Sequence, residues 1–202
     1  MRQSFGGARA DETIYRRGEK TDDVFILCYG WTLAVAILPD GRRQILSILM
    51  SGDLLSTELI FRDTLGISFQ ALTQVRYSRI RRADIQARLA SDPGTLQALA
   101  QVFLAETKAA QDMIIDLGRR TADERIARLL VSLARRVRER SVIREERYPF
   151  PLRQRDIADL VGLTPVHVSR VIGKFRRAGL IAHAGGVLTI LDAAGLERVA
   201  LG

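Results

Sequence analysis

Short alternating apolar runs dominate the first eighty residues of the chain. They follow a polar, Gly-rich lead-in at 1–11 that we expect to be loosely placed, and turn residues such as Gly18-Glu19 and Pro39-Asp40-Gly41 separate them. The predicted strands cover 13–16, 24–29, 32–38, 43–50, 67–73 and 75–80. Short antiparallel strands at this spacing predict a small β-sandwich or barrel.

A long amphipathic helix is predicted after Asp92-Pro93, and we place it at 92–118. Its apolar positions recur at intervals of three and four residues along one stripe, which Glu106 interrupts. The stripe consists of Leu96, Leu99, Phe103, Ala110, Met113 and Leu117. Such a stripe needs an apolar partner, and the chain's own strands are one candidate.

A hinge is predicted at Gly118, because the capping box Thr121-Ala122-Asp123-Glu124 begins a new helix directly afterwards. One face of this helix is apolar, and the opposite face carries Arg128, Arg135, Arg136, Arg138 and Arg140. These arginines can meet phosphates, although a solvated basic face explains them equally well. A polar connector at 141–147 follows.

The segment 152–180 predicts two short helices joined by a tight turn. Gly162 can adopt the positive φ that ends the first helix. Thr164 is a natural N-cap for the second helix, with Pro165 at its first position. Apolar residues then repeat at helical spacing, which leaves an outer face of Val166, His167, Ser169, Arg170 and Lys174. This pattern is typical of a helix-turn-helix whose second helix lies in a DNA major groove, although plain helical hairpins also contain glycine turns.

The C-terminal segment contains a further hairpin and a last helix. Apolar runs at 180–183 and 187–191 flank Ala184-Gly185-Gly186, which would make the helix-turn-helix a winged one. Asp192 is placed to cap the last helix.

The composition of the chain indicates a type of binding partner and a cellular compartment. The chain has 202 residues, of which 47% are hydrophobic, so it can form two domains. Residues 1–118 hold 14 Lys and Arg against 14 Asp and Glu, whereas 119–202 hold 17 against 9. The excess positive charge indicates a polyanion bound by the C-terminal part, or else a merely solvated basic surface. Cys28 is the only cysteine, and the apolar run 24–38 is too short to span a bilayer, so we expect a cytoplasmic protein with no membrane partner.

The C-terminal segment resembles the DNA-binding domain of the Crp/Fnr family of bacterial transcription regulators. The matching stretches are Ile157-Ala158-Asp159-Leu160-Val161-Gly162-Leu163-Thr164, Val168-Ser169-Arg170-Val171-Ile172 and Ala178-Gly179-Leu180-Ile181. The resemblance implies an α+β protein with an N-terminal antiparallel β-roll at 1–91, a dimerisation helix at 92–118 and a winged helix-turn-helix at 119–202. It also implies a homodimer held by the apolar stripe of the long helix, and contact with RNA polymerase.

The resemblance extends to the family's cyclic-nucleotide-binding β-roll, but the ligand residues differ. Cyclic-nucleotide binders carry a Gly-Glu pair for the ribose and an Arg before Ser or Thr for the cyclic phosphate. Aligned on Gly52-Asp53, this chain has Ser56-Thr57 and Ile67 at those positions. Without the bidentate Arg, we expect no cyclic AMP binding and no cofactor. Family members also carry an extra helix and strand before this point, so the chain is either naturally short or starts further upstream.

The leading hypothesis is a dimeric, sequence-specific regulator that binds double-stranded DNA. Its predicted DNA-binding residues are Thr164, Val166, His167, Ser169, Arg170, Lys174 and Arg176. Arg170 suits a guanine edge and Arg176 a phosphate, whereas Val166 stands where the family usually has Glu. The alternative is a ligand- or redox-sensing module with Cys28, in an apolar strand, whose basic domain binds DNA without selectivity. We do not expect an enzyme, because the sequence has no Ser/His/Asp arrangement, P-loop or metal-ligand cluster.

Overall fold

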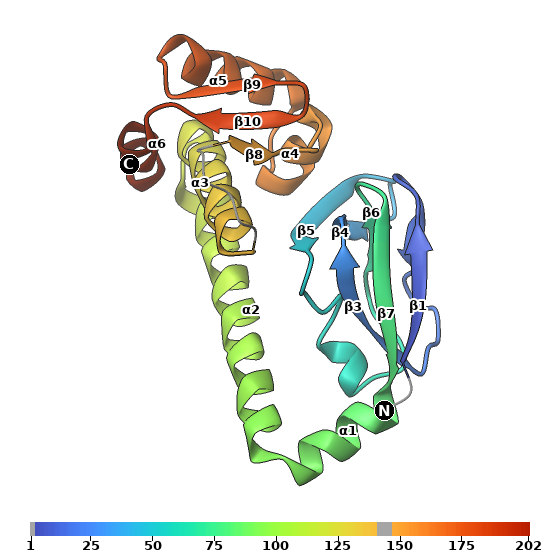
Figure 1. Ribbon diagram of the computed structural model, residues 1–202. Coiled ribbons are helices and arrows are strands. Elements are labelled where there is room, and N and C mark those ends of the chain that lie inside the picture. The colour runs from blue at the N-terminus through green and yellow to red at the C-terminus, as the bar shows by residue number, and fades with distance from the viewer. Residues whose placement is uncertain (1–2, 141–146) are drawn as a thin grey trace. The chain divides into compact units, whose positions relative to one another are not determined.

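The computed structural model describes residues 3–140 and 147–202, so the predicted connector at 141–147 falls almost wholly outside the described residues. The chain divides into two compact units, Met1–Gln111 and Asp112–Gly202, which are considered separately. Both units appear in Figure 1 with their elements labelled.

The first unit contains two antiparallel sheets. One has the order β1-β7-β3, formed by β1 (Gln3–Ala8), β7 (Val75–Arg81) and β3 (Asp23–Tyr29). The other has the order β2-β6-β4-β5, formed by β2 (Thr13–Tyr15), β6 (Ser68–Ala71), β4 (Trp31–Ile37) and β5 (Arg43–Met50). The predicted antiparallel β-domain is therefore confirmed, and the six predicted strands are present with boundaries shifted by at most a few residues.

The expectation of a loosely placed lead-in is wrong. Residues 3–8 form β1, which pairs with β7 along its whole length, from Gln3 opposite Ile80 to Ala8 opposite Val75. The strand carries one large apolar residue, Phe5, which is 63% exposed, and its glycines lie beside an aromatic residue of the partner strand. The ring of Tyr77 lies over Gly6, where an added Cβ would come within 2.6 Å of Tyr77 Cε2. A Gly-rich segment can thus be a paired strand when an aromatic residue covers it.

The core of the first unit lies between the sheets and reaches the helices that follow. It is built from aromatic and aliphatic side chains such as Tyr15, Leu27 and Phe69, and it also includes Leu59 of the short 3-10 helix η1 (Glu58–Ile60). Cys28 lies in the apolar strand predicted for it, but its side chain is exposed. The reason is strand alternation: Leu27 is fully buried, so the next side chain points outward, where the register of β3 also shifts.

Two helices follow the strands. The first, α1 (Arg82–Ser91), was not predicted, because its periodicity is weak and no residue in it is buried. The second, α2 (Pro93–Arg119), directly follows Asp92, whose carboxylate accepts hydrogen bonds from the Gly94 N–H at 3.0 Å and the Thr95 hydroxyl at 2.7 Å. The helix does not stop at Gly118. The carboxylate of Asp116 pairs with Arg120 one turn later at 3.0 Å, which supports the last turn despite the glycine.

The second unit is a winged helical domain. Its helices are α3 (Ala122–Arg140), α4 (Gln154–Val161), α5 (Pro165–Arg177) and α6 (Ala193–Leu201). A three-stranded antiparallel sheet has the order β8-β10-β9, from β8 (Arg147–Pro149), β10 (Val187–Ile190) and β9 (Ile181–Ala184). The predicted hairpin is present, with Gly185 and Gly186 at φ 57° and 73°. Asp192 caps α6 as predicted, accepting the Gly195 N–H at 2.8 Å. No helix within 3–140 and 147–202 is long and apolar enough to cross a membrane.

Candidate nucleic-acid interface

The turn between α4 and α5 has the predicted geometry. Gly162 ends α4 at φ 65°, in the left-handed region, and its N–H donates to the carbonyl of Ala158. Thr164 is extended, and its hydroxyl accepts the backbone N–H of His167 at 3.2 Å. Pro165 is the first residue of α5. This capping sets where α5 starts and so which of its side chains face outward.

The two faces of α5 differ sharply. Val168, Val171 and Phe175 are almost completely buried in the second unit. On the opposite side Val166 is 71% exposed. Ser169 and Arg170 are exposed beside it. The apolar face thus fixes the helix, and the outer face is free to meet a partner.

The outer face of α5 borders a shallow depression. Pro165, Val166, Ser169 and Arg170 line it from α5, and Gln154 lines it from the first residue of α4. Gln154 was missed in the sequence. The available signal was its place at the start of the first helix of the pair, where free backbone N–H groups favour an anion. The depression thus offers an aliphatic group, a hydroxyl, an amide and a guanidinium.

The remaining predicted DNA-binding residues lie in different surroundings. His167 is half-buried, next to the cap. The ammonium of Lys174 pairs with Asp123 of α3, so its charge is already engaged within the unit. Arg176 is exposed and lines a second shallow depression with Gly173 and Arg177. The structure therefore brings Val166, Ser169 and Arg170 together around one depression, whereas Thr164 acts as the helix cap and Lys174 pairs within the unit.

The arginines predicted on the exposed face of α3 differ in their surroundings. Arg128 is half-buried, and its Nε lies 2.8 Å from the carboxylate of Asp116. Arg138 donates to the hydroxyl of Tyr148 at 2.6 Å and lies over the same ring. Arg135 is exposed, 4.0 Å from Glu139. At least two of these arginines have structural contacts, which makes a phosphate-binding face along α3 less well supported than the surface of α5.

The residues of the apolar stripe predicted for α2 do not all face the same surroundings: some are exposed and others are buried or half-buried. Leu96, Phe103 and Ala110 are exposed, but Leu99 is 8% exposed and packs in the core of the first unit. Met113 and Leu117 are half-buried. The exposed line continues instead through Ile114, which is 70% exposed. The exposed positions recur at alternating intervals of four and three residues: Leu96, Ala100, Phe103, Thr107, Ala110 and Ile114. Ile114 was missed because the sequence contains two overlapping stripes of equal regularity.

Known proteins match both units of the chain. Residues 8–92 match the model of the cyclic nucleotide-binding domain, and residues 124–199 match the Crp-like helix-turn-helix domain. The nitrogen fixation regulation protein FixK of Bradyrhizobium diazoefficiens is 32% identical over 94% of this chain and 78% of its own length. The transcriptional activator protein FnrL of Cereibacter sphaeroides is 32% identical over 88% of this chain and 72% of its own. The chain belongs to the Crp/Fnr family.

A solved structure agrees with this assignment. FixK2 from Bradyrhizobium japonicum superposes with a TM-score of 0.88 at 25% identity, and the match covers 98% of both chains. As a Crp/Fnr protein, the chain is a DNA-binding transcription regulator, and the surface around Val166 and Arg170 is its candidate DNA interface.

Two residues that we aligned with the family's ligand positions have internal contacts in this Crp/Fnr protein. Thr57 is 2% exposed, and its hydroxyl donates to the carboxylate of Glu106 on α2 at 2.6 Å. Ile67, which we aligned with the phosphate-binding Arg, packs against the core of the first unit. No group of three or more His, Cys, Asp or Glu side chains suited to a metal ion occurs in the described part of the chain.

Proposed function

We propose that this regulator is a homodimer that binds a two-fold operator through α5 and acts on transcription through contact with RNA polymerase. The main support for this proposal is the outer face of α5. Exposed Val166, Ser169 and Arg170 lie there around a depression, and the opposite face of the helix is buried. Affinity for DNA would come from phosphate contacts, and selectivity from these side chains. A cytoplasmic location belongs to the same proposal, since the operator is chromosomal.

The chemistry of the outer face favours a particular kind of half-site. A guanidinium such as that of Arg170 pairs in a bidentate manner with the O6 and N7 of guanine. Val166 has no hydrogen-bonding group, so its methyls suit the methyl group of a thymine. A Glu at that position would accept from a cytosine amino group instead, so we expect a half-site that differs there from those read by family members with Glu.

The exposed stripe of α2 supports the dimer. Leu96, Phe103 and Ile114 expose apolar surface on one line, with intervals that suit a two-stranded coiled coil. Two such subunits would present their α5 helices about 34 Å apart, one turn of B-DNA.

The packing at the ligand positions supports control without cyclic AMP. A cyclic phosphate requires charge-assisted donors, and Ile67 supplies none. The hydroxyl of Thr57 already donates to Glu106, so a ligand that used this hydroxyl would have to break that hydrogen bond. We therefore infer that the purified protein binds its operator without an added nucleotide.

Selection of bound fragments from genomic DNA tests this proposal. Purified protein is mixed with sheared bacterial genomic DNA and excess non-specific competitor, with and without cell extract, and bound fragments are sequenced. The proposal predicts enrichment of a two-fold motif in both samples. Enrichment without any shared motif would support non-selective binding by a basic domain. A motif seen only with extract would mean that a small-molecule effector is required.

A further inference from the structure

One arginine joins the end of α2 to the helix-turn-helix. The side chain of Arg125, near the start of α3, donates from Nη2 to the carbonyl of Leu117 at 2.9 Å and from Nε to the carbonyl of Arg120 at 2.9 Å. Its Nη1 donates to the carbonyl of Val161 at 3.1 Å. The carbonyls of Leu117 and Arg120 lie at the C-terminal end of α2, and the carbonyl of Val161 belongs to the last residue of α4. All three lie at helix C-terminal ends, where carbonyls lack intrahelical partners and a cation is favoured.

Apolar packing reinforces the same junction. A Cβ placed on Gly162 would lie 2.9 Å from Leu117 Cδ2, so the Leu117 side chain sits directly against the turn between α4 and α5. Glycine is favoured at this turn by its positive φ, and a larger residue there would also displace the Leu117 side chain. The last turn of α2 and the helix-turn-helix thus touch through one side chain and one turn.

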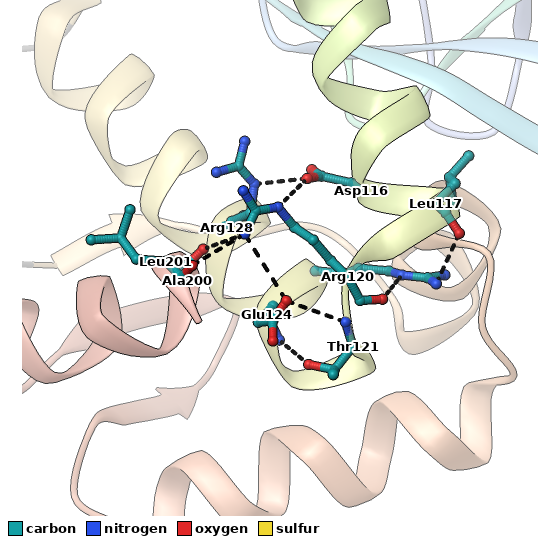
Figure 2. Close-up of polar contacts among 9 residues, drawn as sticks. Asp116, Leu117, Arg120, Thr121, Glu124, Arg128, Ala200 and Leu201 are labelled. Carbon is teal, nitrogen blue, oxygen red and sulfur yellow. Dashed lines mark hydrogen bonds and ion pairs between the residues drawn. The ribbon is translucent and has the colours of Figure 1, made fainter.

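Ion pairs hold the other side of the junction. Figure 2 shows the carboxylate of Asp116 between Arg120, at 3.0 Å, and Arg128, at 2.8 Å. Arg120 also donates from Nη1 to the carbonyl of Ala200 in α6 at 3.3 Å. The end of α2 is therefore fastened to α3 and α6 as well as to α4, and all of these contacts lie within the second unit.

We propose that Arg125 is a positioning residue that fixes the direction of α5 relative to the end of α2, and thereby sets the distance between the two recognition helices of a dimer. This rests on the proposed pairing through α2. A planar guanidinium bonded at three separate points cannot rotate without breaking a bond, whereas the ammonium of Lys is a single point charge on a flexible stem. The residue acts through backbone carbonyls, and contact with DNA is not needed for this role.

The test measures how strictly the protein requires one half-site spacing. Wild type, Arg125→Lys and Arg135→Lys are titrated against operators with the selected spacing, with spacings altered by one or two base pairs, and against a single half-site. Arg135 is the matched control because it lies on the same helix and is exposed. We expect Arg125→Lys to keep half-site affinity within about twofold while its discrimination between spacings falls about tenfold, and Arg135→Lys to match wild type.

Each outcome decides the inference. If folded Arg125→Lys discriminates between spacings as wild type does, Arg125 is not a positioning residue. If its affinity falls equally for the single half-site and for all operators, its role is only structural and the inference is overturned. If Arg125→Lys fails to fold, Leu117→Ala is tested in its place, at concentrations where sedimentation shows a dimer. The measured quantity is again the discrimination between spacings relative to the affinity for a single half-site. A wild type without any spacing preference would contradict the proposed dimer itself.

Discussion

Replacing Ile114 by aspartate should separate the subunits without unfolding them. The side chain is 70% exposed in the single chain, so folding of the chain gains little from it. A carboxylate at the same position would remain in water in the monomer. In a coiled coil through the exposed stripe of α2, two such carboxylates would face each other across the dimer axis.

The expected magnitude follows from the exposed surface. Complete burial of an isoleucine side chain contributes about 1.5 to 3 kcal/mol, so burying the exposed 70% contributes about 1 to 2 kcal/mol in each subunit. The two subunits together lose about 2 to 4 kcal/mol, which raises the dimer Kd roughly 30- to 1,000-fold before any charge repulsion is included.

Sedimentation velocity over a range of protein concentrations measures this Kd. Ile115→Asp is the matched control, because Ile115 is the next residue, is 49% exposed and lies off the stripe. We expect Ile115→Asp to dimerise nearly as wild type does, and both variants to keep the far-ultraviolet circular dichroism spectrum of wild type. The Tm is not the criterion, because the Tm of a dimer falls when association weakens. If Ile114→Asp dimerises as tightly as wild type, the exposed stripe is not the interface and the coiled-coil reasoning is refuted.

Three further outcomes are expected. Calorimetric titration with cyclic AMP should give no binding heat, since Ile67 offers no donor to a phosphate; micromolar binding would contradict this. Arg176→Ala should weaken binding to all DNA sequences alike and reduce the slope of log affinity against log salt by about one, measured by titration at several salt concentrations. The hydrogen bonds from Thr95 and Gly94 hold the pKa of Asp92 below its ordinary 3.8, so the ionised form stabilises the fold. Its contribution is complete above the ordinary pKa and is lost as the pH falls through the lowered one, so the Tm difference between wild type and Asp92→Ala should be present at pH 7 and shrink below about pH 4.

The helix-turn-helix could be predicted from the sequence because its signals are local. The Gly162 turn, the Thr164 cap and the apolar repeat each fix the backbone within a few residues, and all three appear in the structure. The strands were predictable for the same reason, since alternation and turn residues are short-range patterns. The surface of α5 follows once its inner face is known.

The misplaced features all depend on distant parts of the chain. In strand β1, Tyr77 of the partner strand covers Gly6, and the sequence of residues 3–8 does not indicate that partner. Leu99 and Leu117 share one periodicity with Leu96, but tertiary contacts bury the first and half-bury the second. Lys174 lies on the outer face by spacing alone and is engaged by Asp123 of another helix. Periodicity identifies a face, and only the fold decides what covers it.

The affinity ratio of Arg170→Ala for its selected operator over scrambled DNA tests the central claim most directly. Arg170 is exposed at the depression on α5, so the variant should fold normally. We expect the affinity ratio to fall roughly 5- to 150-fold, which corresponds to about 1 to 3 kcal/mol of binding free energy. The preference for one base pair in each half-site should be relaxed. A folded Arg170→Ala that retains the wild-type ratio would contradict the assignment of α5 as the helix that reads DNA.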